Sequence, residues 1–178
     1  MTILSAQEFL NKDIHNNLKD QIDHLSAEAF GHETVYPTVE TAIQVNAFIG
    51  YLEMDGQVVS SGFGKEDTYD QSSRYKTIYI HTFSTKQEYR GKGLCKKIVS
   101  EFIKKFGNTH ILYLTVRTES GHVNESAIKC YERSGFILLP AVYRDHYDGK
   151  NNAMIRVPTT KKTTTTTTRR KKKKSRRR

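Results

Sequence analysis

A chain of 178 residues is long enough to form one domain with a hydrophobic core of its own. Its two cysteines are too few for a disulfide framework, and no apolar run approaches the roughly 18–20 residues that span a membrane. The first residues also lack the charged start and apolar block of a secretory signal, so we expect an intracellular protein, either cytoplasmic or nuclear.

The formal net charge of +10 comes from the C-terminal end of the chain. Residues 161–178 carry eleven Lys and Arg and no acidic residue, whereas the rest of the chain holds 18 basic and 19 acidic residues. A segment of Thr, Lys, Arg and Ser has no apolar side chain to bury, so nothing offsets the entropy of ordering it. We therefore predict a folded domain over residues 1–158 and a disordered basic tail over residues 159–178.

The predicted tail admits three interpretations. Runs of Lys and Arg attract polyanions, so the tail could contact nucleic acid or a nuclear-import receptor. Anionic lipid headgroups are a second class of polyanion, and a solvated terminus without a function is the third interpretation. The first of these would make the chain a nucleic-acid- or chromatin-associated binding protein.

The N-terminal third of the chain shows helical periodicity. Leu18, Ile22, Leu25 and Phe30 recur at roughly helical spacing with charged residues between them, which predicts a helix over residues 18–30.

A second, shorter helix is expected to open near Thr38 and to end before Phe48. The periodicity then changes, because residues 47–67 contain two β-like runs on either side of Asp55 and Gly56. Asp-Gly suits a two-residue type I′ turn, so the sequence predicts a β-hairpin here.

The middle of the chain predicts a strand, a helix and another strand. Residues 74–85 are rich in Ile, Tyr, Phe and Thr, which favours a strand. Apolar residues recur at helical spacing over residues 94–106, and Gly107 is a natural end for this amphipathic helix. Residues 110–116 are an apolar run of strand length, which we expect to be buried on both faces.

The last third predicts one more helix and two more strands. Asn124 is a plausible N-cap for the amphipathic segment that follows it, and Gly135 is the expected stop. Residues 136–145 and residues 153–157 are predicted to form two strands joined by a polar turn.

This order of elements defines a mixed α/β fold. A strand–helix–strand crossover implies parallel pairing, whereas the hairpins on either side of it imply antiparallel pairing. We therefore predict a single domain with a central mixed sheet of six or seven strands and helices on both faces.

The glycine-containing turn before residue 94 predicts an anion site. A strand, a glycine turn and a helix leave backbone N–H groups free at the helix N-terminus, where the helix dipole adds positive character. Gly91 and Gly93 permit positive φ angles and a close approach of phosphate to the backbone. Neither a P-loop nor a dinucleotide fingerprint fits, because the former needs GK[ST] and the latter needs glycine where Lys96 stands. A turn with a purely structural role is the alternative.

Two sequence blocks resemble the GCN5-related N-acetyltransferase superfamily. They are "YRGKGLCKKIV" at residues 89–99 and "NESAIKCYERSGF" at residues 124–136, separated by a predicted strand as in that family. The resemblance implies an acetyl-CoA-dependent N-acetyltransferase whose acceptor is a primary amine: a small amine, a peptide N-terminus or a lysine. It also implies the family's mixed sheet.

The resemblance further implies which residues hold acetyl-CoA. Backbone N–H groups of the glycine turn and the helix start would bind its pyrophosphate, and a bulged strand before them would pair with its pantetheine arm. The residues that match the first role are Arg90, Gly91, Lys92, Gly93, Leu94 and Cys95. The residues that match the second role are His81, Thr82, Phe83 and Thr85. Asn124 matches an asparagine that contacts the cofactor arm.

The resemblance places Tyr131 near the thioester sulfur, as the general acid for the departing thiolate. A base is also needed, because an amine with a pKa near about 10 is mostly protonated at neutral pH. Glu119 and His122, in the segment between the two blocks, are candidates for this base, and His81 or Tyr79 are alternatives.

The chain departs from the family pattern at one position, and two further residue types bear on its chemistry. The family prefers Gln or Arg three residues before the first glycine, whereas this chain has Glu88. Cys95 and Cys130 are interpreted as small buried or cofactor-adjacent residues, since no Cys–His–Asp arrangement is visible. The seven histidines show no metal-ligand spacing, so no metal site is predicted.

Overall fold

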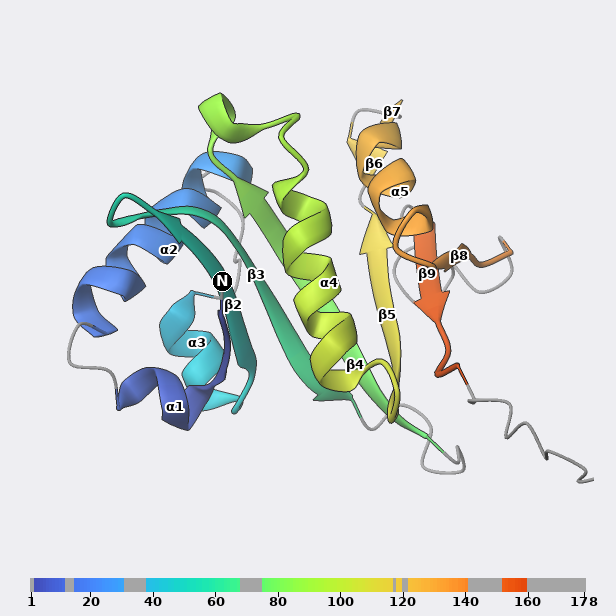
Figure 1. The fold of residues 1–178 in the computed structure, drawn as a ribbon, viewed down its shortest axis with the longest axis horizontal. Helices are drawn as coiled ribbons and strands as arrows, with labels where there is room; N and C mark the ends of the chain where they lie inside the picture. The colour runs from blue at the N-terminus through green and yellow to red at the C-terminus, as the bar shows by residue number, and fades with distance from the viewer. Residues whose placement is uncertain are drawn as a thin grey trace, which may run out of the picture.

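The computed structural model describes residues 2–11, 15–30, 38–67, 75–116, 118–119, 122–140 and 152–159 (Figure 1). The predicted tail beyond residue 159 and residues 141–151 of the predicted last hairpin lie outside this set. The elements in chain order are β1 Thr2–Ser5, α1 Ala6–Leu10, α2 His15–Phe30, α3 Val39–Gln44, β2 Phe48–Met54, β3 Gln57–Asp67, β4 Lys76–Thr85, η1 Gln87–Tyr89, α4 Leu94–Phe106, β5 His110–Val116, β6 Thr118–Glu119, β7 His122–Val123, α5 Glu125–Glu132, β8 Ile137–Leu138 and β9 Asn152–Arg156.

Seven strands form one mixed sheet in the order β1-β2-β3-β4-β5-β9-β8. The pair β4–β5 is parallel and is joined by α4, whereas the other neighbours in the sheet are antiparallel. This confirms the predicted mixed α/β domain and its strand–helix–strand crossover. None of the helices that the structure describes combines the length and the apolarity needed to cross a membrane.

The helices cover the two faces of the sheet and enclose two hydrophobic cores (Figure 1). One core lies between α1, α2 and α3 and the first strands, and it includes Phe9, Ile22 and Phe63. The other lies between the sheet and α4 and α5, and it includes Ile80 and Phe102. The alternation of buried residues along β4 divides its side chains between these two sides of the sheet.

Local signals in the sequence set several element boundaries. Asp55 and Gly56 have φ angles of 50° and 75°, as the predicted type I′ turn requires. Thr38 caps α3 by accepting a hydrogen bond from Thr41 N–H, and Gly107 follows the last residue of α4. These three predictions are confirmed.

The first strand and helix were not predicted. Ser5 and Glu8 form a reciprocal capping box at the start of α1, where Ser5 N–H donates to Glu8 at 2.7 Å and Glu8 N–H donates to Ser5 at 3.2 Å. The spacing of Ser and Glu is a known helix-start signal, so the sequence does contain a signal for α1. The strand β1 has no such signal, because four residues are too few to show a period.

The prediction that β5 is buried on both faces is wrong. Leu112, Leu114 and Val116 are buried, but Ile111, Tyr113 and Thr115 between them are only half-buried. The buried residues face the core beneath α4 and α5. Among the described helices, α2 packs mainly against β3 and β4.

Helix α4 approaches the sheet closely because two glycines lie beneath it. A Cβ atom on Gly64 would lie 2.6 Å from the Phe102 ring, and one on Gly50 would lie 3.1 Å from the same ring. Phe102 is fully buried, and its ring also meets Phe83 edge-on with centroids 6.0 Å apart. Because these rings interlock, the position of α4 relative to β4 is fixed by packing.

Candidate active site

The two parallel strands in the middle of the sheet separate after four residue pairs. Residues Lys76–Tyr79 of β4 pair with residues His110–Tyr113 of β5, but β4 continues to Thr85. On its other side β5 pairs with β9 from Leu112 to Val116, and Figure 1 shows β4 and β5 diverging toward their C-terminal ends. Among the residues that the structure describes, the edge of β4 that faces β5 therefore has no strand partner after Tyr79, and its N–H and C=O groups there can pair with an extended ligand.

A bulge interrupts β4 in this unpaired stretch. Phe63 pairs with His81, whereas Ser61 pairs with Ser84, so β4 has an extra residue relative to β3. Thr82 lies in the bulge with a φ of 52°, which is unusual for a β-branched residue and costs about 1–3 kcal/mol. His81 Nδ1 and Thr82 Oγ1 are 2.9 Å apart and hydrogen-bonded. The bulge turns the backbone of Thr82 and Phe83 away from the regular ladder.

His81 is held in a stack of aromatic rings. Its ring lies 4.9 Å from the Tyr79 ring and 5.9 Å from the Phe63 ring, centroid to centroid, and both contacts are stacked. Burial lowers the pKa of His81 from 6.5 to about 4, and the positive charge of Lys65 acts in the same direction. His81 is therefore neutral at pH 7 and is a weak base, which suits a role in positioning the bulge better than proton abstraction from an amine.

This buried histidine predicts an acid-sensitive fold. The folded pKa lies below the unfolded value, so between pH 6.5 and about 4 the unfolded chain binds more protons. The contribution of neutral His81 to the free energy of unfolding is therefore fully present above pH 6.5. About 3 kcal/mol of the free energy of unfolding is lost as the pH falls to 4. Urea unfolding at pH 7.5, 5.5 and 4.5 measures this loss. His81→Asn should lose clearly less over that interval, and an identical loss in both proteins would contradict the assignment.

The glycine turn and the first turn of α4 lie where the sequence predicts an anion site. Gly91 and Gly93 have φ angles of 74° and 76°, and a Cβ on either would meet no atom within 4 Å. The first hydrogen bond of the helix runs from Lys97 N–H to the Gly93 carbonyl at 3.2 Å. The N–H groups of Leu94 and Cys95 precede that bond, so they have no acceptor within the helix. Backbone donors and the helix dipole together favour an anion at this point.

Arg90 stabilises the turn with its side chain. Its backbone N–H donates to the Gln87 carbonyl at 3.1 Å, so this amide is already used within η1. Its Nε donates to the Thr85 carbonyl at 3.1 Å, and Thr85 Oγ1 is 2.8 Å from Ser60 Oγ. Arg90 and Thr85 thus connect the glycine turn to the end of β4. Ser60 has no recognisable sequence signal, because its role depends on the pairing of β3 with β4.

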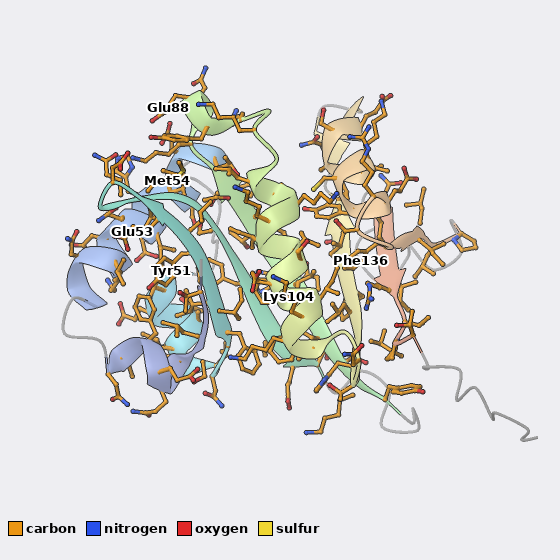
Figure 2. All side chains as sticks on the ribbon, viewed as in Figure 1. Tyr51, Glu53, Met54, Glu88, Lys104 and Phe136 are labelled. Carbon is orange, nitrogen blue, oxygen red and sulfur yellow. The ribbon has the colours of Figure 1, made fainter. Side chains whose placement is uncertain are left out.

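Two further charged side chains border the turn. The ammonium of Lys92 lies 4.8 Å from the centre of the Tyr89 ring, a cation–π contact on the surface of the turn. Glu88 lies in η1 and is exposed; Figure 2 shows it at the end of the molecule where β4 finishes. Because water screens an exposed carboxylate, the departure from the family pattern at Glu88 leaves the positive character of the helix start intact.

Helix α5 carries the second block of the sequence and packs on the same core as α4. Asn124 is its N-cap and accepts a hydrogen bond from Ala127 N–H at 3.0 Å, as predicted. Tyr131 is buried, with its ring 5.9 Å from Phe83 and 6.1 Å from Phe136. The side chain of Phe83 therefore belongs to the core, and only its backbone is placed to pair with a ligand.

The hydroxyl of Tyr131 is difficult to ionise. Burial raises the pKa of Tyr131 well above its usual value, and nearby Cys95 and Cys130 act in the same direction. Tyr131 therefore keeps its proton at neutral and moderately alkaline pH. Cys95 lies in the first turn of α4 and its Sγ is 2.7 Å from Cys130 Sγ, so α4 and α5 are in contact next to Tyr131.

Two of the candidate bases lie in a small hairpin. Strands β6 and β7 pair antiparallel, and their register places Glu119 opposite His122. The hairpin connects β5 to Asn124 and so lies at the C-terminal end of β5 (Figure 1). The side chains of Glu119 and His122 lie outside the described residues. The alternative candidate Tyr79 lies on β4, where its hydroxyl is 3.1 Å from Thr115 Oγ1.

Comparison with known proteins agrees with this geometry. The family model "Acetyltransferase (GNAT) family" matches residues 16–136. A search of curated proteins gives no significant match. Among solved structures, a protein from Corynebacterium glutamicum described as histone acetyltransferase HPA2 and related acetyltransferase is 17% identical with a TM-score of 0.63, and the alignment covers 90% of this chain and 98% of that one. The ribosomal-protein-S18-alanine N-acetyltransferase from Escherichia coli is also similar, at 17% identity, a TM-score of 0.57 and coverage of 91% and 97%.

The Salmonella typhimurium protein yncA, solved with its cofactor acetyl-CoA, has 16% identity, a TM-score of 0.57 and coverage of 90% of this chain and 95% of that one. At these identities the structural likeness establishes the fold, and the family model establishes the family. The chain belongs to the acetyltransferase (GNAT) family. It is an acetyl-CoA-dependent N-acetyltransferase, with acetyl-CoA as its cosubstrate.

Proposed function

We propose that this enzyme transfers the acetyl group of acetyl-CoA to a primary amine on a small molecule, a peptide N-terminus or a lysine, with Tyr131 as the general acid. One observation carries the proposal. The glycine turn at the start of α4 comes shortly after a bulged strand, β4, with only the short helix η1 between them, and within the described part of the chain the edge of β4 that faces β5 has no strand partner beyond Tyr79. An anion site and an edge for an extended chain thus lie in succession, which fits a ligand with a pyrophosphate and a long amide-containing arm.

The residues present fit acetyl-CoA at both ends of this path. The N–H groups of Gly91, Gly93, Leu94 and Cys95 are the proposed donors to the pyrophosphate, with the charge of Lys92 nearby. Arg90 contributes through the hydrogen bond from its side chain to the Thr85 carbonyl. Its backbone N–H does not contribute, because it already donates to the Gln87 carbonyl.

The proposed partners of the pantetheine arm lie on either side of the gap between β4 and β5. They are the backbone of His81, Thr82 and Phe83 on β4 and the side chain of Asn124 at the start of α5. The amide of Asn124 remains able to donate while its oxygen caps the helix.

The chemistry requires a neutral amine, donors for a tetrahedral oxyanion and a proton for the departing thiolate. The bulged backbone at Thr82 supplies N–H groups outside the regular ladder, which suits the oxyanion. Tyr131 supplies the proton. Because the raised pKa of Tyr131 lies above that of a thiol, proton transfer from its phenol to the free thiolate is uphill, so its contribution to the rate is modest. Glu119 and His122 are proposed as the groups that remove the amine proton.

Isothermal titration of the full chain with acetyl-CoA tests the proposal, and a thiol-release assay over a panel of amines, peptides and lysine-containing proteins identifies the acceptor. We expect saturable binding and release of one thiol for each acetyl group transferred. An absence of binding at millimolar acetyl-CoA would remove the proposed site. Binding without thiol release from any amine would leave the anion site and remove the acceptor assignment.

Replacing Tyr131 with phenylalanine separates its catalytic role from packing. We expect Tyr131→Phe to lower kcat by about 10- to 100-fold with little change in the Kd of acetyl-CoA, since only the proton donor is lost. Calorimetry gives Kd and the thiol-release assay gives kcat. Because the pKa of Tyr131 is raised, loss of its proton should not limit the native enzyme below about pH 10. An equal loss of kcat and affinity would indicate that the hydroxyl supports packing.

The basic tail is proposed as a second, independent contact with a polyanion. The charge observation favours it, since residues 161–178 hold eleven of the 29 basic residues of the chain. If nucleic acid is the partner, its binding should weaken steeply with salt, and deletion of residues 160–178 should abolish that binding while leaving acetyl-CoA affinity unchanged. Fluorescence anisotropy with a labelled duplex at 50 and about 200 mM salt measures this. Unchanged nucleic-acid binding after the deletion would exclude this role for the tail.

A further inference from the structure

The two cysteines of the chain are close together in space. Cys95 lies in the first turn of α4 and Cys130 lies near the end of α5, 35 positions further along the chain. Their Sγ atoms are 2.7 Å apart, which is only about 0.7 Å longer than a disulfide bond of about 2.05 Å. Both are free thiols and both are partly exposed, so a small oxidant in solution can reach them.

We propose that Cys95 and Cys130 are an oxidative modification site, at which a low-molecular-weight disulfide converts the two thiols into a reversible disulfide that joins α4 to α5. The proposal rests on the distance between the thiols and on their exposure, and it does not depend on the acetyltransferase function. It assigns a role to two residues that take no part in the proposed acetyl transfer through their side chains.

The reaction is thiol–disulfide exchange in two steps. The thiolate of one cysteine attacks a sulfur of the small disulfide, which forms a mixed disulfide and releases one small thiolate. The second cysteine then loses its proton and displaces the remaining small thiolate, which closes the Cys95–Cys130 bond. Two electrons pass from the protein to the small disulfide, and the two protons lost by the cysteines are taken up by the two small thiolates at a pH below their pKa.

The surroundings favour Cys130 as the attacking thiol. The hydrogen bond between the two thiols lowers the pKa of Cys130, and the positive charges of Lys96 and Arg133 act in the same direction. The same hydrogen bond raises the pKa of Cys95, and burial raises it further. Cys130 is therefore the better thiolate, and Cys95 is in place to resolve the mixed disulfide because it is already within hydrogen-bond distance.

A disulfide at this position would connect the start of α4 directly to the helix that carries Tyr131. It would also close a loop of 35 positions in the unfolded chain, which lowers the entropy of the unfolded state. For a domain of this size, the midpoint of thermal unfolding should rise on the order of 10 °C. Reduction should return the midpoint to its original value, because only one covalent bond has been added.

The full chain treated with oxidised glutathione provides the test. Intact-mass measurement after alkylation of the remaining thiols should show a monomer that has lost two hydrogens and gained no alkyl group. Peptide mapping should recover residues 95 and 130 in one cross-linked species. The midpoint of thermal unfolding should rise by about 10 °C, and dithiothreitol should reverse both changes.

The single variants Cys95→Ser and Cys130→Ser are matched controls, because the chain has only two cysteines. Each should stop at a mixed disulfide with glutathione and show no rise in the unfolding midpoint, while circular dichroism confirms that each is folded. Any one of three results would overturn the proposal. They are glutathione adducts on both cysteines of the native chain, a disulfide-linked dimer instead of the internal bond, or an internal bond without a thermal shift.

Discussion

Gly91→Glu is expected to weaken the binding of acetyl-CoA at least about 100-fold while leaving the domain folded. Two effects combine at this position. Gly91 has a φ of 74°, which any other residue adopts only with strain, so the turn that orients the N–H groups is disturbed. The added carboxylate also lies where the pyrophosphate is proposed to bind. Loss of two hydrogen bonds to a charged group, at about 1.5–3 kcal/mol each, already exceeds a 100-fold change in affinity.

Gly56→Glu is the matched control for this variant. Gly56 has a φ of 75°, and a Cβ there also meets no atom within 4 Å, so the backbone strain and the added charge are equivalent. It lies in the turn between β2 and β3, outside the proposed pyrophosphate site. Calorimetric titration should show less than about a threefold change in Kd for Gly56→Glu.

Equal weakening of acetyl-CoA binding by the two glutamate variants would show that general charge, and not the glycine turn, controls the binding. Unfolding of the Gly91→Glu protein, as seen by circular dichroism, would support the purely structural interpretation of the turn. The space around Gly91 argues against unfolding, since the new side chain would extend into open surroundings.

Phe102→Ala is expected to lower the free energy of unfolding by about 3–5 kcal/mol, the largest effect on stability among the variants considered. The ring of Phe102 is fully buried between Gly50, Gly64 and Phe83, so its removal leaves a cavity under α4. For a domain of this size the midpoint of thermal unfolding should fall on the order of 10 °C. Urea unfolding followed by circular dichroism measures the change.

Lys104→Ala is the control on the same helix, because Lys104 (labelled in Figure 2) is exposed and forms a surface ion pair with Glu101. It should change the free energy of unfolding by less than about 0.5 kcal/mol. A similar loss in both variants would show that helix propensity, and not packing, determines the stability of α4.

A double-mutant cycle measures the coupling between Gly64 and Phe102. Gly64→Ala alone should be destabilising, because its Cβ would lie 2.6 Å from the Phe102 ring. In the Phe102→Ala background the ring is gone, so the same change should cost little. The coupling energy should therefore be about 1 kcal/mol or more, and a value near zero would indicate that α4 does not depend on this contact.

Predictions from the sequence succeeded where the energy depends on neighbouring residues. The turn at Asp55 and Gly56, the helix start near Thr38 and the cap at Asn124 each involve contacts within three residues, and each is confirmed. The Ser–x–x–Glu spacing of the capping box at Ser5 is a local signal of the same kind. The prediction that β5 is buried on both faces is wrong, because that burial depends on which distant segments cover the strand. The strand predicted over residues 136–145 is also shorter than expected, since only Ile137–Leu138 of its described part are in a strand.

Part of the candidate site could also be predicted. The spacing of Gly91 and Gly93 at a strand-to-helix junction predicted an anion site, and the structure gives both glycines positive φ angles. The bulge at Thr82 was known only through the resemblance to a family, since threonine has no preference for a φ of 52°. Its position follows from the register between β3 and β4, which brings Phe63 opposite His81.

The sequence by itself determined the order of the elements, the glycine turn, the helix caps and the concentration of positive charge in the last eighteen residues. The tertiary structure alone decided the divergence of β4 from β5, the burial of His81, the hydrogen bond from the Arg90 backbone N–H to Gln87 and the closeness of Cys95 to Cys130. The physical reason is the range of the interactions. Turns and caps are formed by residues a few positions apart, whereas strand register and core packing join segments that are tens of residues apart, and no local pattern records them.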